Sequence, residues 1–200
     1  MGTCHYIRYL QIANIVLSAM ATAKSNPQVV LRPQDLVVLL RLSLERGPAP
    51  TYAMLADELR LTASEIHAGL GRAVLAQLAR KDAAGKASVV REALRLFVQH
   101  GARYAFPATH GGTTRGMPTS YAAAPLKEKI VQPNEPTPVW PNKNGTVRGV
   151  AFYPLYPTVP EAASRNPALY ELLVLFDAVR GGSPRERALA LDLLDERLKG

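Results

Sequence analysis

The chain has 200 residues and a mass of 21.7 kDa, enough for one medium-sized domain that buries its own hydrophobic core. Its single cysteine, Cys4, excludes an internal disulfide and a zinc site built from paired cysteines. The 24 Lys and Arg residues outnumber the 16 Asp and Glu residues, and the net charge of +8 favours an anionic partner. No apolar stretch approaches the roughly 18 residues of a membrane span, so we expect a soluble, cytoplasmic protein with no membrane partner.

Composition divides the chain into four parts. Residues 1–23 hold one formal charge, at Arg8, whereas residues 105–160 hold 10 of the 16 prolines. We expect a leader or disordered extension over 1–23, a basic domain over 24–104, a proline-rich segment over 105–160 and a helical part over 161–200.

The first 23 residues allow three interpretations. The sequence from Met20 to Lys24 is typical of a natural start, which makes the preceding residues either an incorrectly assigned leader or an extension. The third interpretation is a secretory signal with its cleavage site among residues 19–23. Such a signal needs a continuous apolar core, which polar side chains interrupt at Gln11, Asn14 and Ser18. We therefore favour the leader or the extension.

Two helices are predicted in the first part of the basic domain. Pro33 suits the first turn of a helix because its missing N–H would be unpaired there, and a stripe of leucines follows. Gly47 and Pro48 end this helix. A second helix begins near Thr51 and has leucines one turn apart on its inner side.

The next helix has the clearest start signal in the chain. Thr62 and Glu65 fit a capping box, in which the Thr62 hydroxyl accepts from the backbone N–H of Glu65 and the carboxylate accepts in return. The helix is predicted to run to about Ala79, with apolar residues at every fourth position on its core side. The opposite face is short-chained and has one charge; it comprises Ser64, His67, Ala68, Gly71 and Arg72.

The stretch TYAMLADELRLTASEIHAGLGRA, residues 51–73, resembles the helix-turn-helix of bacterial winged-helix transcription regulators of the MarR, ArsR and GntR kind. The Leu-Ala pair, the Leu-x-Leu-Thr turn and the Ser-x-Ile entry to the next helix carry the resemblance, which covers residues 33–104. Arg60 stands where such turns often have glycine, and Gly69 stands where an apolar residue is common. The resemblance implies a winged helix-turn-helix domain whose helix from Ala63 enters the major groove of DNA.

By this resemblance, the exposed face of the helix contacts bases. Arg72 can pair with a guanine through two hydrogen bonds, and Ser64 and His67 can donate or accept. Ala68 can touch a thymine methyl, and Gly71 permits close approach to another surface. The competing interpretation is a contact between the same face and a partner protein.

Residues 80–88 occupy the place of a wing and have little strand character, so any wing is short. Lys81 and Lys86 are candidates to neutralise DNA phosphates, and a solvated turn is the alternative. A helix is predicted from Val89 to His100. We expect its Arg91 to lie on a solvated outer face rather than to contact a phosphate.

Helical periodicity disappears after Ala105, and we expect an ordered loop packed on the body of the protein. Its glycine pairs lack the pattern of a phosphate-binding loop, but Arg115 is a candidate second contact to DNA or to a ligand. Asn144-Gly145 is a favoured two-residue turn, so residues 139–153 are predicted to form a β-hairpin. The aromatic side chains nearby are expected in the core, with a ligand pocket as the alternative: Trp140, Phe152, Tyr153 and Tyr156.

Two leucine-rich helices are predicted at the end of the chain. Asn166-Pro167 begins the first, Gly181-Gly182 ends it, and Ser183-Pro184 begins the second with another capping box. We expect a helical hairpin. The resemblance implies that such flanking helices form a homodimer interface and place two copies on half-sites about one helical turn apart.

We expect neither an active site nor a metal site, because the histidines are scattered and no nucleophile elbow or zinc motif is present. The expected fold class is mainly α with small β elements. The expected function is that of a dimeric repressor that binds double-stranded DNA without a cofactor. Three alternatives remain: an antitoxin-like regulator with a partner protein, an interaction module that does not bind DNA, and a small-molecule sensor that uses residues 105–156.

Overall fold

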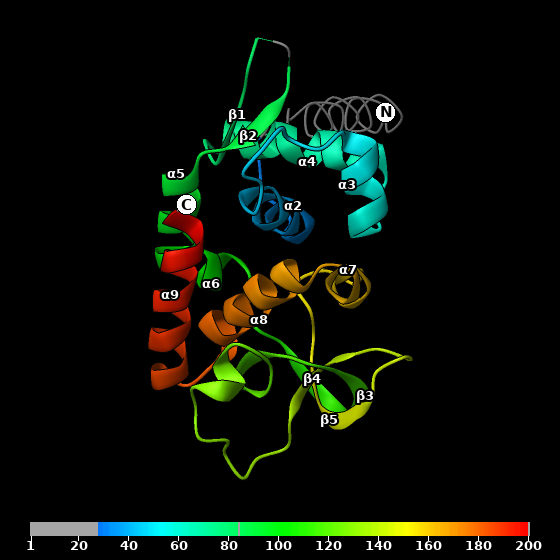
Figure 1. Ribbon diagram of the computed structural model, residues 1–200, viewed down its shortest axis with the longest axis vertical. Helices are drawn as coiled ribbons and strands as arrows, with labels where there is room; N and C mark the ends of the chain where they lie inside the picture. Colours follow the sequence, from blue (N-terminus) through cyan, green and yellow to red (C-terminus); the bar gives the residue numbers. More distant parts are fainter. Residues whose placement is uncertain (1–27, 84, 200) are drawn as a thin grey trace, which may run out of the picture.

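The computed structural model describes residues 28–83 and 85–199, which form a mainly helical molecule with small β elements, as expected (Figure 1). The α-helices are α2 (Pro33–Ser43), α3 (Tyr52–Leu59), α4 (Ala63–Leu75), α5 (Arg91–His100), α6 (Ala102–Ala105), α7 (Val159–Arg165), α8 (Pro167–Gly181) and α9 (Pro184–Lys199). The strands are β1 (Ala79–Lys81), β2 (Ala87–Val89), β3 (His110–Pro118), β4 (Pro138–Pro141) and β5 (Val147–Phe152), and short 3-10 turns are η1 (Ser120–Ala122) and η2 (Leu126–Glu128). The predictions for residues 1–23 lie outside the described residues. Of the helices described, none is both long and apolar enough to cross a membrane.

A short turn joins α3 to α4, and the helix boundaries follow the capping chemistry of the sequence. The hydroxyl of Thr51 accepts from the backbone N–H of Met54 at 3.2 Å and caps α3. Arg60 ends α3 in the left-handed conformation, with a φ of 55°. The predicted capping box is confirmed, because the backbone N–H of Glu65 donates to the Thr62 hydroxyl and the backbone N–H of Thr62 donates to the Glu65 carboxylate.

α4 is shorter than predicted and leads into a hairpin. It ends at Leu75, and the chain reverses at Gln77, whose φ is 60°. β1 and β2 then pair antiparallel, with Ala79 opposite Val89. Because Val89 lies in this hairpin, α5 begins at Arg91, two residues after the predicted start.

The segment expected to be a loop contributes a strand to a small barrel. β3 pairs antiparallel with both β4 and β5, and β4 pairs parallel with β5, so the three strands close on themselves. The hairpin predicted over residues 139–153 is corrected accordingly: a turn closes from the N–H of Gly145 to the carbonyl of Asn142 at 3.0 Å, but its flanking strands both pair with β3. Glycine permits this close approach, since a Cβ on Gly149 would lie 1.9 Å from the carbonyl oxygen of Thr137.

A buried carboxylate on α8 fastens the barrel to the helices. Asp177 accepts from the Thr119 hydroxyl at 2.7 Å and from the indole N–H of Trp140 at 2.5 Å. The guanidinium of Arg180 donates to its other oxygen at 2.9 Å. Trp140 and Phe152 are buried in the core. This is the location that the sequence analysis favoured for them over a ligand pocket.

A shared hydrophobic core joins the two ends of the described chain. α8 lies between α2 and the barrel (Figure 1), and its residues 172–179 are all buried. α9 packs against both α8 and α5. The leucines of residues 161–200 are therefore used inside the protomer. The homodimer interface expected on these helices stays a prediction, and it would have to use side chains other than the buried leucines.

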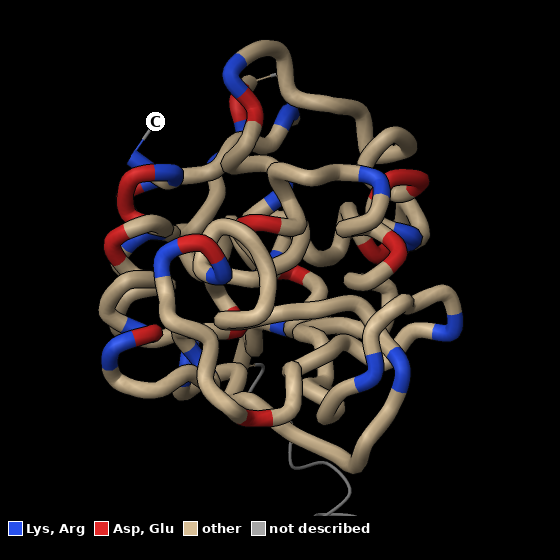
Figure 2. Tube along the Cα trace, turned by 60° about the horizontal axis from the view of Figure 1, so that its bottom comes forward, with Lys and Arg blue, Asp and Glu red and all other residues tan. Residues whose placement is uncertain are grey.

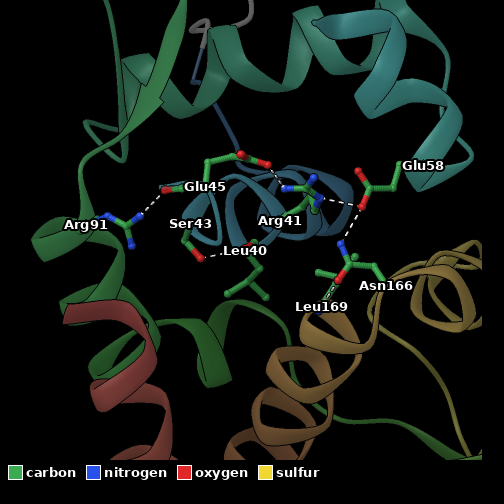
Figure 3. Close-up of polar contacts among 8 residues, drawn as sticks. All are labelled: Leu40, Arg41, Ser43, Glu45, Glu58, Arg91, Asn166 and Leu169. Carbon is green, nitrogen blue, oxygen red and sulfur yellow. Dashed lines mark hydrogen bonds and ion pairs between the residues drawn. The ribbon is translucent and has the colours of Figure 1, made fainter. Parts of the chain in front are cut away.

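A series of polar contacts joins α2, α3 and α8 (Figure 3). The Nε of Arg41 donates to a carboxylate oxygen of Glu58 at 2.7 Å, and the side-chain amide of Asn166 donates to the same oxygen at 2.6 Å. Asn166 also caps α8 by accepting from the backbone N–H of Leu169 at 3.0 Å. Burial opposes the negative charge of Glu58, but these hydrogen bonds prevail and lower the pKa of its carboxyl group. The position of α3 is thereby tied to the start of α8.

Candidate nucleic-acid interface

α4 has one face in the core and one face open to solvent. Ile66 is fully buried, at 0% exposure. On the opposite side Ser64, His67 and Ala68 are exposed, and Gly71 continues the same face while half-buried. The structure therefore brings these predicted base-contacting residues together on one accessible surface, which we call the α4 face.

Tyr52 connects the α4 face with the β1–β2 hairpin. Its ring packs edge-on against the His67 imidazole, with ring centroids 5.8 Å apart, and its hydroxyl donates to the carbonyl oxygen of Gly85 at 3.5 Å. Reasoning from the sequence misses Tyr52, because its place at the first residue of α3 gives no periodic signal. An aromatic side chain directly after the capping Thr51 is the only hint that the sequence offers.

Arg72 does not belong to the open face. Its Nε and Nη2 donate to the two carboxylate oxygens of Asp35, each at 2.7 Å, and the Asp35 side chain is 0% exposed on α2. The Arg72 side chain is 19% exposed, and its hydrogen bonds to Asp35 raise its pKa. The expected pairing of Arg72 with a guanine is therefore corrected, because this guanidinium holds α4 against α2.

Gly69 leaves the space in which this ion pair forms. A Cβ on Gly69 would lie 2.7 Å from Oδ1 of Asp35, closer than a real contact allows. The carboxylate thus explains why Gly69 departs from the apolar residue common at this position. The sequence signal for the pair is the acidic residue at the start of an apolar helix, which indicates a buried partner without saying which one.

Cations on the β1–β2 hairpin extend the surface of α4. Arg80, Lys81 and Lys86 are exposed, and the Nε of Arg80 makes a long contact of 3.4 Å to the Ser88 hydroxyl. The strands of three residues each confirm that the hairpin is short. Both lysines are accessible to solvent, as phosphate contacts require.

Arg115 lies at the opposite end of the molecule from α4. It is on β3 of the barrel (Figure 1), where its direct cross-strand neighbour is Arg148 of β5. Both arginines are exposed, and basic segments gather at this edge of the barrel (Figure 2). The structure therefore separates the predicted second contact from the α4 face, and DNA docked on α4 would lie away from it.

Comparisons with protein-family models, with curated proteins and with solved structures find no match to this chain. In the part of the chain that the structure describes, no group of three or more His, Cys, Asp or Glu side chains is placed to hold a metal ion. The surfaces described above are thus the basis for a functional proposal.

Proposed function

We propose that the protein binds double-stranded DNA with α4 as its recognition helix and that it regulates transcription. The observation that carries this proposal is the open face of Ser64, His67 and Ala68 on a helix that α2 holds from behind. The major groove is wide enough to admit a helix presented in this way. Ser64 and His67 supply donors and acceptors for base edges, and Ala68 suits a thymine methyl.

Electrostatic attraction comes from the hairpin, because the α4 face itself is uncharged. Arg80 and Lys81 are exposed on β1, and Lys86 is exposed directly before β2. Each phosphate contact they make should steepen the salt dependence of binding by about one unit. The net charge of +8 supports the same kind of partner, and binding to genomic DNA implies a cytoplasmic protein.

Repression by a homodimer on two half-sites belongs to the same proposal. Since the leucines of α8 are buried inside the protomer, two copies would have to meet through another surface. Sedimentation of the protein with and without duplex measures the number of copies bound.

Fluorescence anisotropy with duplexes from the upstream region of the protein's own gene, and with a scrambled duplex, tests the proposal. We expect selective binding that weakens with salt. His67→Ala should weaken binding to the selected duplex by about tenfold and leave the scrambled duplex unaffected, whereas Lys81→Ala should weaken both equally. Arg185→Ala, at an exposed arginine on α9, is the control for loss of charge. Equal affinity for the two duplexes would contradict the proposal.

A second candidate function is the binding of a partner protein. Two exposed apolar side chains favour it. Leu75 on α4 is 68% exposed and Met54 on α3 is 61% exposed. Such side chains suit an apolar partner surface, as in an antitoxin-like regulator that binds a toxin. Leu75→Lys separates the candidates, because it adds a cation that strengthens duplex binding and removes an apolar contact. A neighbouring gene's product that binds the wild type but not Leu75→Lys would favour the second candidate.

A further inference from the structure

A cavity of about 490 Å³ lies between the loop after α2, the β1–β2 hairpin and the start of α5. Arg80 and Arg91 are the basic side chains of its lining. Burial, followed by the nearby charge of Arg46, lowers the pKa of Arg91. An apolar wall completes the cavity and includes Leu42, Ala49, Ala87, Val89 and Val90.

Arg91 is incompletely paired in this cavity. Its Nη2 donates to the backbone carbonyl of Glu45 at 2.8 Å (Figure 3). Its Nη1 is buried and has no hydrogen-bond partner within the described residues. This half-buried position corrects the expectation of a solvated outer face. A charged donor that is buried without an acceptor is unfavourable, and an anion that reached it would relieve this cost.

The acidic side chains at the cavity do not supply that group. The Glu45 carboxylate is bonded to Arg41 at 2.5 Å, and the Glu92 carboxylate is bonded to Arg95 at 2.6 Å. Each glutamate is thus paired with an arginine outside the cavity lining, which also pairs with a second carboxylate, Glu58 for Arg41 and Asp195 for Arg95. The positive charges of Arg80 and Arg91 remain available to a ligand.

The start of α5 adds backbone donors to the same place. Val90 precedes the helix and provides no side-chain cap, so the N–H groups of the first turn have no capping side chain. The N-terminus of this ten-residue helix carries partial positive charge and favours anions. Two arginines, one of which has an unpaired buried donor, and an uncapped helix start therefore lie around one cavity.

We propose that this cavity binds a small organic phosphate. The phosphoryl group would pair with Arg80, Arg91 and the start of α5, and the organic part would pack against the apolar wall. The volume is that of a small-molecule site rather than of an inorganic ion alone. The cavity shares Arg80 with the hairpin cations proposed to contact DNA, but Arg91 and the apolar wall are not part of that interface, so the proposal does not require DNA binding.

Titrations of the full chain with inorganic phosphate and with phenyl phosphate test this site. The backbone amide NMR signals of residues 87–93 report the binding. We expect saturable binding of both probes, with phenyl phosphate tighter because it also covers the apolar wall. Arg80→Ala, which changes an exposed side chain and leaves the fold intact, should weaken binding by about tenfold. Arg91→Ala should abolish it, and Arg185→Ala should match the wild type.

A duplex titration separates the two sources of a phosphoryl group. For a free organic phosphate, which we expect, Arg91→Ala leaves duplex affinity unchanged while phenyl phosphate binding is lost. For a DNA backbone phosphate at the same site, phenyl phosphate competes with the duplex and Arg91→Ala weakens both. Shifts that do not saturate, or that are the same in Arg80→Ala and Arg185→Ala, would overturn the proposal.

Discussion

Arg72 of α4 and Asp35 of α2 are joined by two hydrogen bonds of 2.7 Å that connect both ends of the carboxylate to one guanidinium. The carboxylate is completely buried, and besides Arg72 it has the backbone N–H of Arg32, which donates to Oδ2 at 2.9 Å. Neither side chain lies on the α4 face, yet together they set the orientation of the helix that displays it.

Removing one member of this ion pair should destabilise the fold strongly. Arg72→Ala is expected to lower the free energy of unfolding by about 3–5 kcal/mol, because it leaves a buried carboxylate without its charged partner. Urea denaturation measures the loss. The double variant Asp35→Ala/Arg72→Ala should lose less than the sum of the single variants, and strictly additive losses would contradict the pairing.

Gly69 and Gly71 provide a matched pair of tests on α4. Gly69→Ala is expected to destabilise the protein by about 1–3 kcal/mol, because the new methyl meets Oδ1 of Asp35. Gly71→Ala meets nothing within 4 Å and should stabilise the helix by about 1 kcal/mol through its higher helix propensity. Thermal denaturation shows whether each variant is more or less stable than the wild type. If both substitutions change the stability in the same direction, the result would contradict the packing described around Gly69.

The left-handed Arg60 is expected to carry strain. Arg60→Gly and Arg60→Ala both remove its ion pairs to Asp57 and Glu161, which are exposed and contribute little. Glycine adopts a φ of 55° freely, whereas alanine does not, so the glycine variant should be the more stable by about 1 kcal/mol. Denaturation of the two variants side by side gives this difference, and a more stable alanine variant would refute it.

Tyr170 should make stability depend on pH in the alkaline range. Its hydroxyl donates to the carbonyl of Pro118 at 2.7 Å, and burial raises the pKa of Tyr170 from 10.0 to about 12. Between these values the unfolded chain releases the proton while the folded chain keeps it, so stability falls as the pH rises. The loss should stay below the roughly 2–3 kcal/mol that the full shift corresponds to, because solvent screens this partly exposed phenol.

Tyr170→Phe is the control for this pH dependence. The variant should be less stable at neutral pH, because the Pro118 carbonyl loses its donor, and its stability should fall less steeply above pH 10. In an ultraviolet titration of Tyr170→Phe, the phenolate that forms at the highest pH in the wild type should be absent. Identical alkaline profiles for the two proteins would contradict the assignment.

Local chemistry explains which elements the sequence predicted correctly. The capping box of Thr62 and Glu65 acts within one turn, and the helix start at Ala63 is where the sequence placed it. The division of α4 into a buried and an exposed face follows from helical periodicity alone. These features depend on residues that are close together in the chain.

The features that were missed depend on distant partners. Periodicity puts Arg72 on the flank of α4, but it does not reveal that a carboxylate far earlier in the chain lies beneath it. β3 is rich in glycine and threonine without an apolar alternation, and it becomes a strand through pairing with β4 and β5. Helical spacing likewise places Arg91 on the outer side of α5, but in the folded protein the loop after α2 lies over it and accepts its hydrogen bond.

The location of α8 has a consequence for how the protein is made. α2, which supports α4 through Asp35, itself rests on α8, a helix that is synthesised much later than α2. A ribosome-bound chain that has released only its first hundred residues would expose the underside of α2 to water. The surface proposed to recognise DNA should therefore become competent only after α8 has been synthesised, so partial products that end before α8 would not compete for operator sites.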